Sequence, residues 1–110
     1  DPPPPPAPTR EIYQLSGHAE AVNCACFTLE CDMLASCSDD ASLRVWRLPE
    51  YDNTNRVIRG KGACLAVLRG VAQGNPHGHS EAVTQCEFTP DAVSLVSASD
   101  DTLIKVWDPR

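Results

Sequence analysis

The chain has 110 residues, with 9 basic and 15 acidic side chains, so its formal net charge at neutral pH is −6. This length allows one small domain or a segment of a larger one, and the acidic balance disfavours general DNA binding, which needs basic surface. No apolar run approaches the ~20 residues of a membrane span and no signal-peptide pattern is present, so we expect neither a membrane protein nor a secreted precursor.

Proline dominates the start of the chain. Six of the ten prolines lie at positions 2–6 and 8. Such a run favours polyproline II, a helix without internal hydrogen bonds. It suits either a ligand of an SH3 or WW domain or a stiff linker, and we favour a proline-rich linker or tail over residues 1–10.

After the tail, short apolar runs alternate with turn signals, a pattern typical of β-strands. The runs cover residues 11–15, 22–27, 33–37, 43–47, 63–68, 83–88, 94–98 and 103–107. Ala, Ser and Cys occupy strand positions that would be polar if one face of the sheet met water. The pattern therefore predicts sheets that pack on both faces.

One unit of sequence occurs twice, at a constant offset of 61 residues from Gly17 to Gly78. The copies match at both Gly-His pairs, both phenylalanines, both Ser-Asp-Asp turns and both tryptophans: Gly17-His18 with Gly78-His79, Phe27 with Phe88, residues 38–40 with 99–101, and Trp46 with Trp107. An internal repeat of this kind is the signature of an architecture built from similar units.

The repeated pattern of Gly-His, Val and Phe, Ser-x-Ser-x-Asp and Val-Trp resembles the WD40 repeat. The resemblance implies an all-β fold of two four-stranded antiparallel blades of a β-propeller, within a larger ring of about four to eight blades. Residues 11–69 would form the first blade, with an insertion at 49–62. Residues 70–110 would form the second, preceded by a rim insertion at 70–77. Residues 11–15 would complete either the second blade, through ring closure, or a preceding blade.

The resemblance also implies a structural tetrad in each unit, in which a histidine links a turn aspartate to a serine that accepts the indole N–H of a tryptophan. The tetrads fall on His18, Ser36, Asp40 and Trp46, and on His79, Ser97, Asp101 and Trp107. Two positions depart from the family pattern. Leu103 stands where Ser or Thr usually follows the turn, which weakens the expected turn hydrogen bonding, and Trp46 is followed by Arg47 instead of Asp.

Two catalytic interpretations are weaker than structural ones. Serine, histidine and aspartate suggest a hydrolase triad, but a catalytic set occurs once per site, whereas this set recurs with the repeat. The pairs Asp39-Asp40 and Asp100-Asp101 suggest glycoside chemistry, but adjacent residues in a tight turn point apart. We therefore predict no catalytic residue and no enzyme.

The cysteines do not show metal-ligand spacing. They stand at positions 24, 26, 31, 37, 64 and 86, without a CxxC pair, and Cys24, Cys26 and Cys37 lie among apolar and small residues. We predict reduced thiols that act as small hydrophobic side chains, in a protein of the cytoplasm, the nucleus or both. The pair His77 and His79 is not a predicted metal site, because His79 is assigned to a tetrad. We expect no metal and no cofactor.

Two features indicate partners. Arg56, Arg59 and Lys61 make the insertion 49–62 the one basic neighbourhood, which suits an acidic protein or RNA, while a solvated loop is the simpler interpretation. The segment Trp107-Asp108-Pro109-Arg110 resembles the WDxR box by which some WD40 proteins bind the propeller adaptor of cullin-4 ubiquitin ligases, with Arg110 as the exposed guanidinium.

The leading functional hypothesis is a non-catalytic scaffold for protein–protein interaction and complex assembly. Its partners would be proteins bound at the propeller rim and loops, together with the remaining blades of the ring. One alternative is a substrate receptor of a cullin-4 ligase, and another is a scaffold of a ribonucleoprotein complex. We expect no membrane contact.

Overall fold

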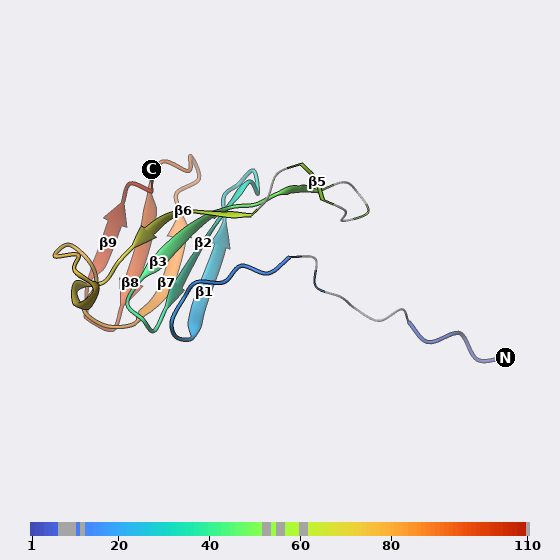
Figure 1. Ribbon diagram of the computed structural model, residues 1–110, viewed down its shortest axis with the longest axis horizontal. Coiled ribbons are helices and arrows are strands. Elements are labelled where there is room, and N and C mark those ends of the chain that lie inside the picture. Colours follow the sequence, from blue (N-terminus) through green and yellow to red (C-terminus); the bar gives the residue numbers. More distant parts are fainter. Residues whose placement is uncertain (7–10, 12, 52–53, 55–56, 60–61, 110) are drawn as a thin grey trace.

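The computed structural model describes residues 1–6, 11, 13–51, 54, 57–59 and 62–109, and it is an all-β structure, as predicted (Figure 1). Its strands are β1 (Val22–Phe27), β2 (Met33–Ser38), β3 (Leu43–Arg47), β4 (Glu50–Tyr51), β5 (Val57–Arg59), β6 (Ala63–Leu68), β7 (Val83–Phe88), β8 (Leu95–Ser99) and β9 (Ile104–Trp107), and a short 3-10 helix, η1, covers Val71–Gln73. No helix in the described part of the chain is long and apolar enough to cross a membrane.

The first sheet has four antiparallel strands in the order β1-β2-β3-β6. The bounds of β1, β3 and β6 are those predicted from the apolar runs, and β2 extends one residue further, to Ser38. Within the sheet Cys24 lies opposite Cys37, and Leu34 lies opposite Trp46. The segment between β3 and β6, which are the third and fourth strands along the chain in this sheet, contains the insertion proposed at 49–62.

The second sheet repeats the first with three strands, in the order β7-β8-β9. The strand pairing shifts register between Val22 and Cys24 in the first sheet, and at the equivalent place, between Val83 and Gln85, in the second. In the described part of the chain β9 pairs with β8 alone.

Residues 11–15 were predicted to form a strand, and the structure shows none at Glu11 or at residues 13–15. A strand is defined by its ladder of backbone hydrogen bonds, and the apolar pattern of this stretch does not specify the partner that the ladder needs. The sequence pattern alone therefore gave a wrong prediction here.

The insertion 49–62 contains a hairpin in place of the predicted polar loop. Strands β4 and β5 pair antiparallel in a sheet of their own, with Glu50 opposite Arg59. Figure 1 shows β5 beyond the end of β3 and β6, away from the two larger sheets. Two strands of two and three residues are too short to give the alternating pattern by which strands are recognised.

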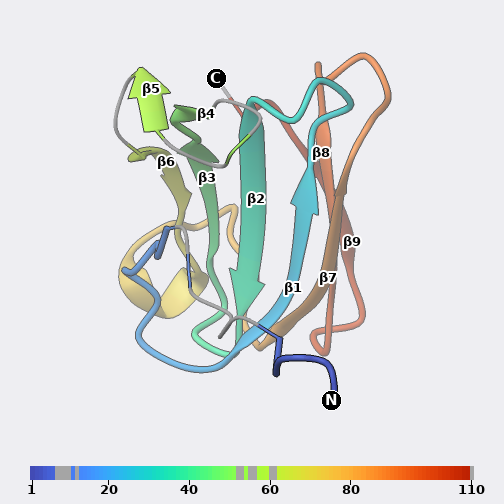
Figure 2. The same ribbon diagram turned by 90° about the vertical axis from the view of Figure 1, so that its right-hand side faces the viewer.

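The core lies between the two larger sheets, where β1 and β2 pack against β7 (Figure 2). Its buried members are Ala35, Cys37, Leu43, Val45, Val83, Cys86, Phe88 and Leu95. A polar link crosses the same interface, because the Asn23 side chain donates to the Val83 carbonyl at 2.9 Å and to Asp39 at 2.8 Å. One face of β1 and β2 thus packs against β7, whereas Val22 and Phe27 on β1 are 56% and 58% exposed, so the predicted packing on both faces is not seen at β1.

Two turns of each unit place a residue with a side chain in left-handed backbone conformation. The residues are Cys31 (φ 60°) and Ala41 (φ 70°) in the first unit, and Ala92 (φ 60°) and Thr102 (φ 76°) in the second. The left-handed region brings Cβ close to the following carbonyl, at a cost of roughly 1–2 kcal/mol. Thr102 is the most unfavourable of these, because its side chain is β-branched.

We expect Thr102→Gly to raise the free energy of unfolding by about 1 kcal/mol. Glycine removes the left-handed penalty at this exposed turn, and the extra entropy of the unfolded chain offsets part of the gain. Thr102→Ala is the matched control, since it keeps Cβ and should change stability less. Chemical denaturation of the three proteins measures the difference, and an unchanged or lower stability of Thr102→Gly would contradict the interpretation.

Candidate functional site

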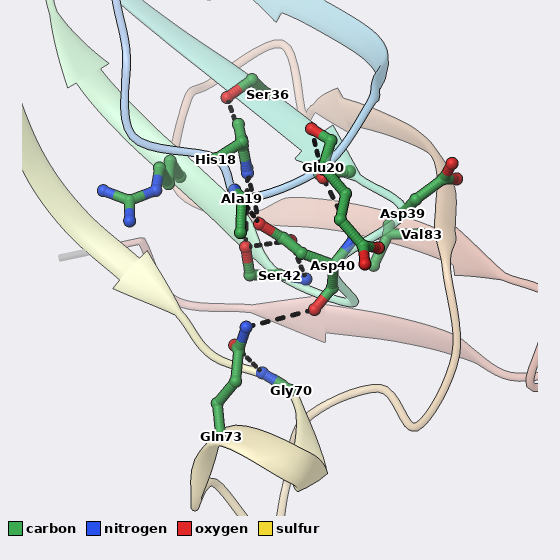
Figure 3. Close-up of polar contacts among 12 residues, drawn as sticks. His18, Ala19, Glu20, Ser36, Asp39, Asp40, Ser42, Gly70, Gln73 and Val83 are labelled. Carbon is green, nitrogen blue, oxygen red and sulfur yellow. Dashed lines mark hydrogen bonds and ion pairs between the residues drawn. The ribbon is translucent and has the colours of Figure 1, made fainter.

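The structure brings the four predicted residues of the first unit into one hydrogen-bonded chain, of which Figure 3 shows His18, Ser36 and Asp40. His18, in the segment before β1, places Nε2 2.7 Å from Ser36 Oγ on β2 and Nδ1 3.3 Å from Asp40 Oδ2 in the following turn. Trp46 on β3 donates its indole N–H to the same Ser36 oxygen at 2.9 Å. The network thus ties the segment before β1 to β2, the turn and β3.

The second unit forms the same chain of hydrogen bonds, with a shorter distance between its histidine and its aspartate. His79 Nε2 lies 2.7 Å from Ser97 Oγ, and His79 Nδ1 lies 2.7 Å from Asp101 Oδ2. Trp107 donates to Ser97 Oγ at 2.8 Å, and its ring meets the His79 ring edge to face at 6.2 Å. His79 is fully buried, whereas His18 is half-buried.

Each turn aspartate is held by several donors. Asp40 Oδ1 accepts the hydroxyl of Ser42 at 2.6 Å and its N–H at 2.9 Å, while Oδ2 accepts the Ala19 N–H at 3.0 Å. Burial raises the pKa of the Asp40 carboxyl, but these hydrogen bonds and the one from His18 outweigh burial and bring the pKa to about 2. The carboxylate is therefore ionised at neutral pH.

Leu103 removes one side-chain donor from the second turn, and the backbone hydrogen bonds of that turn remain. Asp101 accepts the Leu103 N–H at 2.8 Å and the Ser80 N–H at 3.1 Å, and leucine supplies no hydroxyl where Ser42 does in the first turn. Burial again raises the pKa of Asp101, and the Leu103 N–H, the His79 side chain and the Ser80 N–H lower it to about 2. The backbone donors maintain the turn without the side-chain donor.

The geometry leaves these residues little scope for chemistry on a bound substrate. Ser36 and Ser97 are 6% and 1% exposed, and each oxygen already contacts an imidazole and accepts an indole N–H. A nucleophilic serine has to face the substrate. A cavity of about 420 Å³ lies elsewhere, and none of its lining residues is a member of a tetrad: Gln85, Cys86, Glu87, Phe88, Thr89, Pro90, Val96, Ala98 and Ile104.

The rim insertion 70–77 lies beside the first turn. We use the term histidine rim for the end of the sheets that bears the turns 38–42 and 99–103 and residues 70–79. Gln73 of η1 donates to the Asp40 carbonyl at 3.2 Å and accepts the Gly70 N–H at 2.9 Å, as Figure 3 shows. Gly78 is enclosed by backbone, because a Cβ there would meet the Arg69 carbonyl.

The other predicted binding residues are only partly described. Arg56, Lys61 and Arg110 lie outside the described residues, and Arg59 is the last residue of β5. Trp107 is the internal donor to Ser97, and Asp108 is exposed.

Sequence reasoning missed a cluster of thiols. Cys24, Cys37 and Cys86 place their sulfur atoms within 4.8 Å of one another, and Cys26 Sγ lies 3.8 Å from Cys86 Sγ. Cys86 is separated from the other three by about half of the chain, and no spacing rule connects them. The only signal in the sequence was that these four cysteines all lie on predicted strands.

Comparison with known proteins identifies the architecture. The family described as "WD domain, G-beta repeat" (WD40) matches residues 9–47 and 62–108. The chain belongs to the WD40 repeat family. The match covers both copies of the repeat, and it confirms the resemblance seen in the sequence.

Several curated WD40 relatives are similar over most of this chain. The WD repeat, SAM and U-box domain-containing protein 1 of Danio rerio is 36% identical over 94 residues, which are 86% of this chain and 16% of that protein. Nuclear distribution protein nudF 2 of Aspergillus clavatus is 33% identical over 102 residues, which are 93% of this chain and 20% of that protein. The chain thus spans a fifth or less of these relatives.

Solved structures support the same fold. The WD40 repeats of RRP9 match with a TM-score of 0.66 at 24% identity, covering 86% of this chain and 24% of that one. U3-55K matches with a TM-score of 0.67 at 25% identity, covering 86% of this chain and 25% of that one. Both comparisons place the two sheets within a WD40 architecture.

We expect Ser36→Ala to lower the free energy of unfolding by about 1–3 kcal/mol, because it leaves the buried indole N–H of Trp46 without its acceptor. Ser97→Ala should also cost about 1–3 kcal/mol, because it leaves the fully buried His79 without its partner, although Trp107 itself is half-buried. Ser80→Ala, at an exposed position next to the histidine rim, is the control and should change stability by less than about 0.5 kcal/mol. Equal losses for Ser36→Ala and Ser80→Ala in chemical denaturation would refute this role.

The low pKa values of Asp40 and Asp101 predict acid sensitivity. An unfolded aspartate has a pKa of about 3.9, above the folded value of about 2, so the unfolded chain binds more protons between these values. The stabilisation is present above about pH 4 and is lost as the pH falls towards 2. Denaturation at constant ionic strength should show Asp101→Asn losing less stability than the wild type over this interval. Parallel curves for the two proteins would contradict the prediction.

Proposed function

We propose that this chain is a non-catalytic WD40 scaffold segment that binds partner proteins at the histidine rim. The observation that supports it most directly is the anchored rim insertion. Gln73 fixes η1 to the Asp40 carbonyl, and Asp40 is itself held by the first tetrad. An exposed loop on such a rigid support is where binding residues are usually found.

The tetrads act as internal braces in this proposal. Their serine, histidine and aspartate side chains bond to one another and to tryptophan, and both serines are buried. A complete polar network of this kind rigidifies the strands that it joins. This structural role accounts for the serine, histidine and aspartate of each unit without a catalytic function.

Further blades complete the proposed architecture, with residues 11–69 and 70–110 as two successive blades. The outer face of the second sheet is apolar and exposed, with Ile104 74% and Val106 69% exposed on β9. An open, apolar edge strand is a liability unless another element covers it. A neighbouring blade is the occupant that the repeat architecture supplies, and the much greater length of the relatives leaves room for one.

The finer alternatives rest on residues whose side chains are not described. Arg56, Arg59 and Lys61 are the residues by which the insertion would contact an acidic protein or RNA, and Arg110 is the residue that a ligase adaptor would bind. We place the protein in the cytoplasm, the nucleus or both, which is supported by six free cysteines and by relatives named as nuclear distribution proteins.

We expect Val71→Asp to reduce binding of partner proteins at the histidine rim. Val71 is 47% exposed on η1, so a carboxylate there should disturb the rim surface while leaving the core intact. Quantitative co-purification from the source organism compares the partners of the variant with those of the wild type. The recovered amount of each partner that binds this rim should fall at least about tenfold, which corresponds to a loss of about 1.4 kcal/mol of binding free energy.

Leu29→Asp is the matched control. Leu29 is 81% exposed in the turn between β1 and β2, at the opposite end of the sheet from the histidine rim. It should keep the full set of partners, and circular dichroism should show that both variants are folded. The proposal fails if Val71→Asp retains every partner or if both variants lose the same ones.

A further inference from the structure

Four cysteine side chains meet between the two sheets. Cys24 and Cys26 come from β1, Cys37 from β2 and Cys86 from β7. The sulfur atoms of Cys24, Cys37 and Cys86 lie within 4.8 Å of one another, and Cys26 Sγ lies 3.8 Å from Cys86 Sγ. Cys31 and Cys64, by contrast, are exposed in a turn and on β6.

The strand geometry explains why these thiols converge. Residues two apart on a strand share a face, which brings Cys24 and Cys26 to the same side of β1. The register places Cys37 directly opposite Cys24 on the neighbouring strand. This side of the sheet packs against β7, from which Cys86 approaches.

We propose that Cys24, Cys37 and Cys86 bind a thiophilic divalent cation of the Zn²⁺ type, and that Cys26, whose sulfur lies beside Cys86 but outside this group of three, rotates inward as the fourth ligand. Zinc bonds thiolate sulfur at about 2.3 Å in a tetrahedral site, which separates the sulfurs by about 3.8 Å. Cys26 and Cys86 already have this separation, and a contraction of about 1 Å brings the sulfurs of Cys24, Cys37 and Cys86 to it, while the Cys26 side chain has to rotate towards Cys24 and Cys37. Four sulfur ligands in this geometry are typical of zinc.

The contacts that the thiols now make are weak enough to be replaced. Cys24 Sγ lies 3.7 Å from the Cys86 carbonyl, and Cys86 Sγ lies 3.9 Å from the Ala35 carbonyl. Thiols are weak donors, so losing these contacts when the thiols release their protons costs little. A cation of charge +2 offsets half of the charge of the four thiolates and so lowers the cost of holding them in an apolar interior.

The differing exposure of the cysteines allows a cation to enter. Cys37 is fully buried and Cys86 is 6% exposed, whereas Cys24 and Cys26 are half-buried. A cation can therefore meet the β1 thiols first and then bind the inner pair. Because the ligands belong to both sheets, the bound cation would cross-link the first repeat to the second, and it would stabilise the folded state by binding that state alone.

Titration of the reduced protein with Co²⁺ under anaerobic conditions tests the site. We expect one equivalent of Co²⁺ to produce the visible absorption of tetrahedral cobalt with thiolate ligands, and Zn²⁺ to displace it. Zn²⁺ should also raise the midpoint of thermal unfolding of the reduced protein. Folded, reduced protein that shows neither the tetrahedral spectrum nor the rise overturns the proposal.

Variants locate the ligands. Cys86→Ala should abolish the cobalt spectrum, and Cys24→Ala, at a half-buried position, provides a second test if the first variant does not fold. The control is Cys31→Ser/Cys64→Ser, which removes the two exposed thiols and should retain the spectrum. A spectrum that persists in folded Cys24→Ala, or that disappears from the folded control, rules out the assignment.

Discussion

A buried indole N–H requires an acceptor, and this requirement organises each unit of the molecule. Trp46 is 5% exposed, so water cannot replace the Ser36 oxygen that accepts its proton. Ser36 in turn contacts His18, and Asp40 holds the other side of the imidazole. One donor on β3 therefore fixes β2, the turn after it and the segment that enters β1. Removing any member leaves another buried polar group without a partner.

The two units satisfy this requirement in unequal surroundings. Trp46 stands on a strand with neighbours on both sides, β2 and β6, and the guanidinium of Arg44 lies 5.9 Å from its ring. Trp107 stands on β9, which pairs with β8 alone among the described strands, and it remains half-buried. The tryptophan end of the network is therefore enclosed in the first sheet and closer to water in the second, although His79 and Ser97 are fully buried. A strand and a sheet packed on the second unit would remove this difference.

The repeat made most of the fold predictable, and its resemblance to the WD40 family implied the tetrads, because these features depend on residues within one unit. Strands β1, β3 and β6 have the predicted bounds, and His79, Ser97 and Asp101 meet as the pattern implies. The features that escaped prediction depend on contacts that periodicity does not encode. Residues 11–15 have a strand-like pattern without a specified partner, and β4 and β5 are too short to have a pattern at all.

The thiol cluster is another feature that the repeat pattern could not predict. The cysteines do not occupy equivalent positions in the two repeats. At the offset of 61 residues, Cys24 and Cys26 correspond to Gln85 and Glu87, and Cys86 corresponds to Ala25. The cluster therefore arises only when two unequal repeats pack together, and not from either repeat alone. A cation held there would add a bond between the units, whereas each tetrad braces a single unit. The interface between the units is thus the place where departures from the repeat give this chain a property of its own.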